Sequence, residues 1–135
     1  MADTAKENIL DRTAPHNIEA EKSVIGSMLM DKDAIEAALG MLTRDDFYSR
    51  QYATMFEAIR KLYNQDTVVD LVTVQEQLAK DGAPHEMQTV DFLKDIFEFN
   101  AVSVNVRSYA EIVRDKAVQR RLIKECGEIS QMCYD

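Results

Sequence analysis

Apolar residues recur with the spacing of a helix along nearly the whole chain. The clearest stretch runs from Tyr48 to Tyr63, where apolar side chains return every three or four residues and form one wide stripe. Such a stripe could line a ligand pocket, but we favour a helix that packs into a core. Its members are Tyr48, Tyr52, Met55, Phe56, Ile59, Leu62 and Tyr63. The pattern predicts an all-α fold.

Three shorter helical patterns surround this stripe. The first follows Pro15 and can be capped by Asn17. The second runs from about residue 34 to residue 41, with Asp33 as a candidate cap. The third begins after Thr89 or a neighbouring residue. The apolar residues expected to face the core in these helices are Ile18, Ile25, Met28, Leu29, Ile35, Ala38, Leu39, Phe92, Leu93, Ile96 and Phe97.

The stretch "TVVDLVTVQEQLAKDG", residues 67 to 82, begins as a Val-rich segment and ends as a helix. Thr73 and Glu76 have the spacing of a capping box. Asp70 could instead cap the same helix one turn earlier. Gly82 stands where a left-handed residue is expected to end the helix. We expect a short helix that is entered through an extended connector.

The last segment, Asn105 to Asp135, contains no proline and a single glycine, Gly127. One continuous helix of this length would span about 46 Å. The preceding body should have a radius of gyration of about 13 Å, so the helix should project from it. Alternatively, the helix breaks near Gly127 and folds back.

The apolar residues of this last segment change sides half-way along it. At 100° per residue, the stripes of the two halves lie on nearly opposite sides of the helix, with Arg120 and Arg121 at the changeover. The first stripe would contact the chain's own domain, and the second would contact another subunit or complete the domain's own core. The first stripe consists of Val106, Tyr109, Val113 and Ala117, and the second of Leu122, Cys126, Ile129 and Cys133.

The composition indicates a soluble protein with one globular domain. The chain has 135 residues, of which 46% are hydrophobic and 30% are charged. No apolar run approaches the roughly 18 residues that span a bilayer, and the N-terminus does not resemble a signal peptide. We therefore expect no membrane contact and a cytoplasmic location. The predicted organisation is a flexible tail at 1–14, a helical body at 15–103 and a long helix at 104–135.

The charge distribution indicates little direct binding of DNA. The net charge is −8, and residues 1–103 hold 19 acidic but only 10 basic side chains. Phosphate binding requires Lys and Arg, which are in local excess only between residues 114 and 124. Such a run is usually a solvated helix face. The candidates for a weak DNA contact are Arg114, Arg120, Arg121 and Lys124.

The sequence contains no motif that indicates catalysis or a bound cofactor. None of the four glycines is followed by Lys, so the phosphate-binding P-loop is missing. His16 and His85 do not have a metal-ligand spacing, and we expect no metal site. Cys126 and Cys133 would lie about 10.5 Å apart along a helix, too far for a disulfide, and are expected to be semi-buried thiols. The chain by itself is predicted not to be an enzyme.

Four blocks of sequence resemble, in order and spacing, the N-terminal domain of DnaB-type bacterial replicative DNA helicases. They cover about residues 15 to 130. The blocks are "PHNIEAEKSVIGSML" from Pro15, "DDFYSRQYATMFEAI" from Asp45, "VDLVTVQEQL" from Val69 and "YAEIVRDKAVQRRLI" from Tyr109.

This resemblance implies a compact body of about six helices and a long C-terminal helix that projects as the first arm of a helical hairpin. In the family, such hairpins pair between subunits and the domains form a collar, often a trimer of dimers, on a hexameric ring. The collar receives the C-terminal domain of primase and, in some systems, communicates with the helicase loader. ATP and Mg²⁺ would be bound by a separate RecA-like domain of an ATP-dependent helicase, and this domain is not part of the present sequence.

The resemblance and the second apolar stripe together suggest a protein interface on the last helix. Two other functions remain open: a stand-alone primosome or loader-like adaptor with the same fold, and a small helical domain that binds nucleic acid. A steep dependence of DNA affinity on salt would favour the last of these. The candidate interface residues are Leu122, Ile123, Cys126, Ile129 and Phe92.

Overall fold

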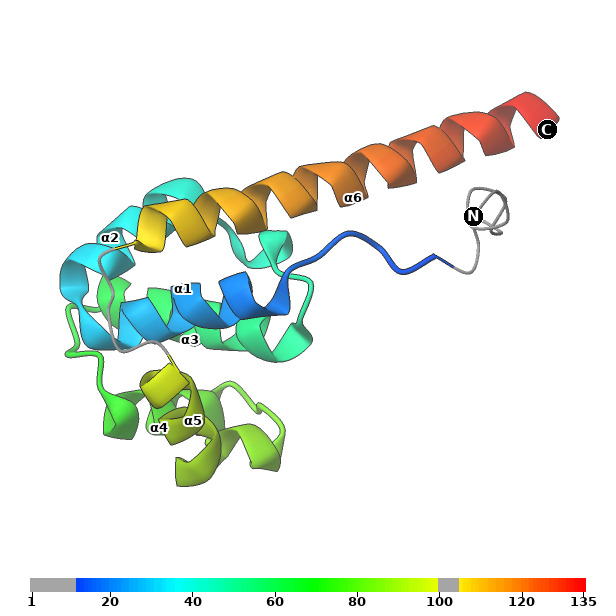
Figure 1. The fold of residues 1–135 in the computed structure, drawn as a ribbon. Helices are drawn as coiled ribbons and strands as arrows, with labels where there is room; N and C mark the ends of the chain where they lie inside the picture. The colour runs from blue at the N-terminus through cyan, green and yellow to red at the C-terminus, as the bar shows by residue number, and fades with distance from the viewer. Residues whose placement is uncertain (1–11, 100–104) are drawn as a thin grey trace.

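The computed structural model describes residues 12–99 and 105–135, which form six α-helices and two short 3-10 helices (Figure 1). No β-strand occurs among these residues. The prediction of an all-α fold is confirmed. In chain order the elements are α1 (Ile18–Met30), α2 (Lys32–Met41), η3 (Arg44–Asp46), α3 (Arg50–Asn64), α4 (Leu71–Lys80), η4 (His85–Gln88), α5 (Val90–Phe99) and α6 (Val106–Tyr134).

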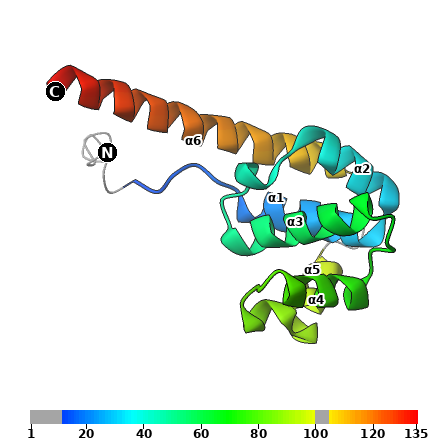
Figure 2. The same cartoon turned by 180° about the vertical axis from the view of Figure 1, so that it is seen from behind.

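Helix α1 lies at the centre of the body and packs against α2, α3, α5 and α6. Helix α6 runs along one side of the body, and α4 and α5 lie on the opposite side (Figures 1 and 2). The second half of α6 extends well beyond the other helices. The helix is continuous through Gly127 to Tyr134, so the predicted projection is confirmed and the alternative break does not occur.

The core is built from the apolar helix faces that the sequence pattern predicts. The Phe47 and Phe56 rings pack with their centroids 5.0 Å apart. Each large apolar side chain that is fully buried stabilises the fold by about 1.5–3 kcal/mol. The largest fully buried apolar side chains are Val24, Ile25, Met28, Met55, Phe56, Ile59, Val74, Leu78, Met87, Leu93 and Ile96.

Helix α3 begins later than the sequence pattern predicts. Its cap is Ser49, whose hydroxyl accepts a hydrogen bond from the Tyr52 N–H. The Glu21 carboxylate of α1, only 1% exposed, accepts hydrogen bonds from the Tyr48 and Ser49 N–H groups at 2.9 and 3.0 Å. These bonds hold Tyr48 outside the helix, and its side chain is exposed. The expectation that Tyr48 belongs to the helical core stripe is therefore wrong.

Two helix caps also differ from the first expectation. Asp31, not Asp33, caps α2, and its carboxylate accepts a hydrogen bond from the Asp33 N–H. Asp70 caps α4, and Thr73 occupies the other end of a capping box, with reciprocal bonds of 2.8 and 2.9 Å. Asp70 was the alternative cap. Gly82 has a φ of 72° and ends α4 as predicted.

Two residues expected in the core lie at its edge. Ile18 in the first turn of α1 and Phe97 in α5 are both exposed. Phe92 is partly buried and packs against the core. Residues 1–11 of the predicted tail, and the predicted boundary between residues 103 and 104, lie outside the described residues.

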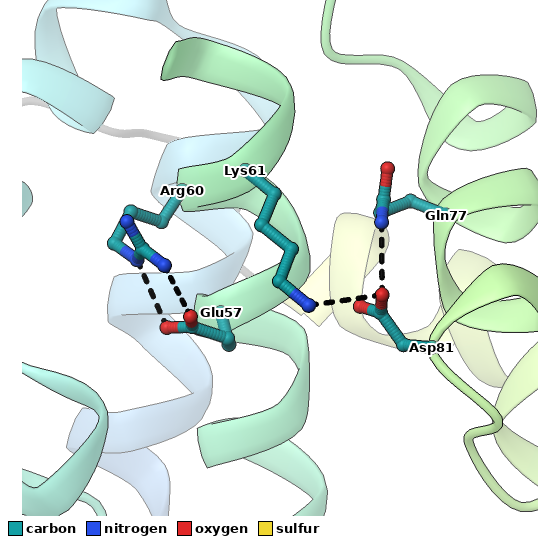
Figure 3. A network of polar contacts seen from close by, with 5 residues as sticks. All are labelled: Glu57, Arg60, Lys61, Gln77 and Asp81. Carbon is teal, nitrogen blue, oxygen red and sulfur yellow. Dashed lines mark hydrogen bonds and ion pairs between the residues drawn. The ribbon is translucent and has the colours of Figure 1, made fainter. Parts of the chain in front are cut away.

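Polar contacts join α3 to α4 at the surface (Figure 3). The Lys61 ammonium donates a hydrogen bond to the Asp81 carboxylate at 3.0 Å. The same carboxylate accepts a hydrogen bond from the Gln77 side-chain amide at 2.9 Å. On the neighbouring turn of α3, hydrogen bonds from the Arg60 guanidinium lower the pKa of the Glu57 carboxyl. The Lys61–Asp81 ion pair joins α3 to the end of α4, whereas the Glu57–Arg60 pair lies within α3.

Candidate functional site

The first half of α6 belongs to the body of the domain. Val106, Ala110, Val113 and Ala117 are buried, and α6 packs here against α1 and α2. Tyr109 is partly buried beside them. This is the face predicted from the first apolar stripe. The small side chains at positions 110 and 117 leave room for the neighbouring helices to approach closely.

Two arginines make the last contacts between α6 and the body. Arg120 donates hydrogen bonds to the Pro15 and Asp46 carbonyl oxygens, both at 2.8 Å. Arg121 donates a hydrogen bond to the Asp46 carboxylate at 3.0 Å. We call these two residues the arginine anchor. The anchor joins α6 to η3 and to the segment that precedes α1.

Aromatic stacking adds to the arginine anchor. The His16 and Tyr48 rings stack with centroids 4.1 Å apart and an interplanar angle of 7°. The Arg120 guanidinium carbon lies 5.7 Å from the centroid of the Tyr48 ring, within the range of a cation–π interaction. Periodicity could not have revealed this cluster, because Arg120 is 105 residues from Pro15 and 74 residues from Asp46 along the chain.

Beyond the anchor, α6 has no neighbour among the described residues. Every residue from Arg121 to Asp135 is exposed, and the helix continues for about 20 Å. Leu122 and Ile129 are each 59% exposed, and Ile123 is 55% exposed. Exposed apolar residues of this size along one segment are typical of a protein interface. We call the segment from Leu122 to Tyr134 the projecting segment.

The exposed apolar residues of the projecting segment largely share one side of the helix. Leu122 and Ile129 are spaced at i and i+7 and lie on the same side as Val118, one turn before the segment, whereas Ile123 lies about 100° around the helix from Leu122. Lys124 and Gln131 lie on the other side. The amphipathic pattern of this part of α6 is thus that of a helix packed against a partner.

The structure brings four of the five candidate interface residues together. Leu122, Ile123, Cys126 and Ile129 all lie on the projecting segment. Phe92 lies on α5, on the opposite side of the body from α6 (Figure 2). A single flat interface therefore cannot include all five residues.

Both cysteines are exposed free thiols, so the expectation that they are semi-buried is wrong. They lie on the projecting segment, where no other part of the described chain covers the helix. They share an apolar stripe with Leu122 and Ile129, and no described residue of the body buries this stripe.

The candidate DNA-contacting residues fall into two groups. Arg120 and Arg121 are held by acceptors within the protein. Arg114 and Lys124 are exposed. A weak DNA contact stays a prediction, and it would rest chiefly on this second pair.

Within residues 12–99 and 105–135, no group of three or more His, Cys, Asp or Glu side chains is placed to hold a metal ion. None of the helices in this part of the chain combines the length and the apolar character needed to cross a membrane. The exposure of Leu122, Ile123 and Ile129 makes the projecting segment the principal candidate site in the described structure.

The sequence and the fold both match a known family. The family described as the DnaB-like helicase N terminal domain matches residues 13–115. The chain belongs to this family. The resemblance predicted from the four sequence blocks is confirmed.

Curated relatives of the chain are replicative DNA helicases. The chain is 36% identical over 124 residues to the replicative DNA helicase DnaC of Bacillus subtilis, a match that covers 92% of the chain and 27% of that protein. It is 33% identical over 124 residues to DnaB of Leifsonia xyli, with the same coverage. The chain thus spans about a quarter of the length of these relatives, and it corresponds to their N-terminal domain.

Solved structures of DnaB N-terminal domains have the same fold. The crystal structure of the domain from Mycobacterium tuberculosis superposes with a TM-score of 0.86 at 32% identity, covering 91% of this chain and 89% of that one. The domain from Helicobacter pylori, described together with its interactions with primase, gives a TM-score of 0.75 at 21% identity, covering 87% and 91%. The second match concerns the fold alone.

Proposed function

We propose that this chain is the assembly and docking domain of a hexameric replicative DNA helicase. Its projecting segment packs against another copy of the domain, as a dimer or a trimer of dimers, and contributes to a collar. The collar receives the C-terminal domain of primase and, in some systems, the helicase loader. ATP hydrolysis and strand translocation belong to a separate domain that binds ATP and Mg²⁺, and this chain contributes no catalytic group.

The observation that carries this proposal is the exposed apolar face of α6. A partner that covered Leu122, Ile123 and Ile129 would stabilise the complex by about 1.5–3 kcal/mol for each side chain that becomes fully buried. The arginine anchor holds the start of this segment, so the helix is presented at a defined angle. Less ordering entropy is then lost on association than for a flexible tail.

The net negative charge of the body supports a role in binding proteins rather than DNA. Residues 1–103 carry 19 acidic and 10 basic side chains. This negative charge disfavours binding of the DNA strand that a helicase passes close to its collar. The primase interactions described for the Helicobacter pylori domain support primase as a partner.

The self-association of the purified domain tests the first part of the proposal. We expect light scattering across a concentration series to give a dimer or a larger species. Leu122→Asp together with Ile129→Asp should shift the species to a monomer, because two charges would enter the apolar contact. A matched control, Lys124→Gln together with Gln131→Asp, changes the charge by the same amount on the other side of the helix and should leave the mass unchanged. An unchanged mass for the Leu122 and Ile129 variant would contradict the proposal.

Binding of a primase C-terminal domain, measured by isothermal titration calorimetry, tests the second part. If the collar surface forms from paired domains, the Leu122→Asp and Ile129→Asp variant should bind primase much more weakly than the wild-type domain. Phe92→Ala, on the other side of the body, tests whether α5 contributes to the same surface. Full primase affinity in the monomeric variant would show that docking does not need assembly.

A further inference from the structure

A cavity of about 340 Å³ lies at the corner where α1 meets α2, beside the connector between α3 and α4. Figures 1 and 2 place this corner at the end of the body opposite the free end of α6. The volume is within the range of about 300–1,000 Å³ that is usual for binding pockets. The cavity is therefore large enough for a bulky side chain and is separate from the interface proposed above.

The floor of the cavity is apolar, and its apolar surface continues onto the exterior. Met28, Leu29 and Ile35 are buried and form part of the lining. Met30 is 39% exposed and Val68 is 71% exposed, and both also line the cavity. A ligand could thus bury one apolar group in the cavity and cover further apolar surface beside it.

The connector that forms one wall has a defined backbone shape. Asp66 has a φ of 55°, which is uncommon for a residue other than glycine. Its N–H donates a hydrogen bond to the Tyr63 carbonyl oxygen at 3.1 Å, and the Thr67 N–H donates one to the Leu62 carbonyl oxygen at 3.0 Å. The wall is therefore formed before any ligand binds, which lowers the entropic cost of binding.

The surroundings of the cavity are acidic. The Tyr63 hydroxyl donates a hydrogen bond to the Glu36 carboxylate at 2.9 Å, and this bond raises the pKa of Tyr63. Lys32, which also lines the cavity, is the only basic residue in the two segments that form this corner, residues 28–36 and 63–70. The acidic residues of these segments are Asp31, Asp33, Glu36, Asp66 and Asp70, and all are exposed.

We propose that this corner is a second docking site, for a short segment of a partner protein in which a bulky apolar side chain lies next to lysine or arginine. The apolar side chain fills the cavity and contacts Met30 and Val68. The basic side chain lies near Asp66 and Asp31. The combination of an apolar floor with an acidic rim selects this chemistry over a purely apolar segment or an acidic one. The site does not depend on the assembly of α6.

A labelled peptide, acetyl-Lys-Lys-Leu-Phe-Lys-Lys-amide, is a suitable probe in fluorescence anisotropy. It should bind the domain, and amide shifts in two-dimensional NMR spectra should map to residues 30–32 and 66–69. Peptides with glutamate in place of lysine, or alanine in place of Leu-Phe, should bind at least tenfold more weakly. Equal binding of all three peptides, or shifts that map elsewhere, would overturn the proposal.

Two variants test the residues of the site. Val68→Lys removes apolar rim surface and adds a repelling charge, so the peptide affinity should fall about tenfold, which corresponds to about 1.4 kcal/mol. The matched control is Val72→Lys on α4, since Val72 is equally exposed but does not line the cavity. It should change the affinity less than twofold. Equal losses in the two variants would show that only overall charge matters.

Asp66→Asn keeps a residue that tolerates a positive φ and removes the charge. We expect the peptide affinity to fall a few-fold at low salt and the difference to shrink as ionic strength rises. No loss at low salt would show that Asp66 does not bind the basic side chain.

The same titrations on the Leu122→Asp and Ile129→Asp variant separate this site from the proposed assembly. Peptide binding should be unchanged there, whether or not that variant is monomeric. If instead the peptide binds only the associated species, or dissociates it, the corner is occupied by a second copy of the chain and the proposal is wrong.

Discussion

The two halves of α6 have similar apolar spacing but opposite environments. In the first half, Val106, Ala110, Val113 and Ala117 are buried against the body. In the second half, Leu122 and Ile129 are more than half exposed. Amphipathic spacing therefore shows that a helix has a side suited to packing, but not whether the same chain supplies the surface that covers it.

The change between the two halves occurs at the arginine anchor. Arg120 donates hydrogen bonds to the Pro15 and Asp46 carbonyl oxygens, and Arg121 donates one to the Asp46 carboxylate. Within residues 12–99 and 105–135, nothing buries α6 after these two residues. The apolar stripe also moves to the other side of the helix at this point. The first half is thus a structural element of the domain, and the second half is available to another molecule.

The largest difference in the free energy of unfolding should appear when an aspartate is introduced into each half of α6. Val113→Asp would place a charge where the side chain is 1% exposed, and should lower the free energy of unfolding by about 3 kcal/mol or more. Ile129→Asp should change it by less than about 0.5 kcal/mol. Urea unfolding at a concentration where the domain is monomeric measures both. A large loss for Ile129→Asp would place the second half in the domain's own core.

A smaller effect should follow removal of the main anchor residue. Arg120→Ala deletes two hydrogen bonds to carbonyl oxygens and the contact with Tyr48, and should cost about 1–2 kcal/mol of stability. Hydrogen exchange of the backbone amides at residues 16 and 17 should become faster. Lys124→Ala, one turn further along α6, is the control and should change neither quantity. Unchanged exchange in the Arg120 variant would mean that the anchor does not hold this segment.

The second anchor residue should contribute less. Arg121→Gln removes an ion pair whose arginine side chain is 55% exposed, and should cost about 0.5 kcal/mol. Added salt should reduce the difference from wild type, because exposed charges are screened. Urea unfolding at low and high ionic strength measures this. A loss as large as that of Arg120→Ala, independent of salt, would show that the pair acts as a single unit.

The smallest effect on the body should come from Gly127→Ala. No atom lies within 4 Å of the place that the new methyl group would occupy. Alanine favours a helix over glycine by about 1 kcal/mol, so hydrogen exchange near residue 127 should slow. The urea midpoint of the monomeric domain should not change. A midpoint shift equivalent to the full 1 kcal/mol would show that the projecting segment unfolds together with the body.

Local patterns in the sequence predicted most of the elements of the fold. The periodicity of α3, the cap Asn17 and the left-handed Gly82 each depend on residues within one or two turns, so the sequence signal is strong. The errors occurred where a distant group competes with local preference. Tyr48 fits the helical stripe, but the buried Glu21 carboxylate binds its N–H and the next one, and the helix therefore starts later.

The candidate site was predicted in part for the same reason. Leu122, Cys126 and Ile129 were proposed because they follow one another at helical spacing, and Ile123 because it lies beside them; the structure shows all four exposed on one segment. Phe92 belongs to a different predicted helix, and the structure places it on α5, on another side of the body. The stacked His16 and Tyr48, and the cavity between α1, α2 and the α3–α4 connector, gave no local signal. They form only when segments far apart in sequence meet.

The sequence by itself determined the all-α fold and the family, because these depend on spacing and on short blocks of residues, and it favoured a continuous last helix over a break near Gly127. The tertiary structure alone decided where along α6 the contacts with the body end and which arginines donate hydrogen bonds within the protein. It also decided where the cavity lies in the acidic corner. Such features depend on which surfaces remain uncovered after the core has packed. A periodic pattern contains no information about that, since it specifies a face but not its neighbour.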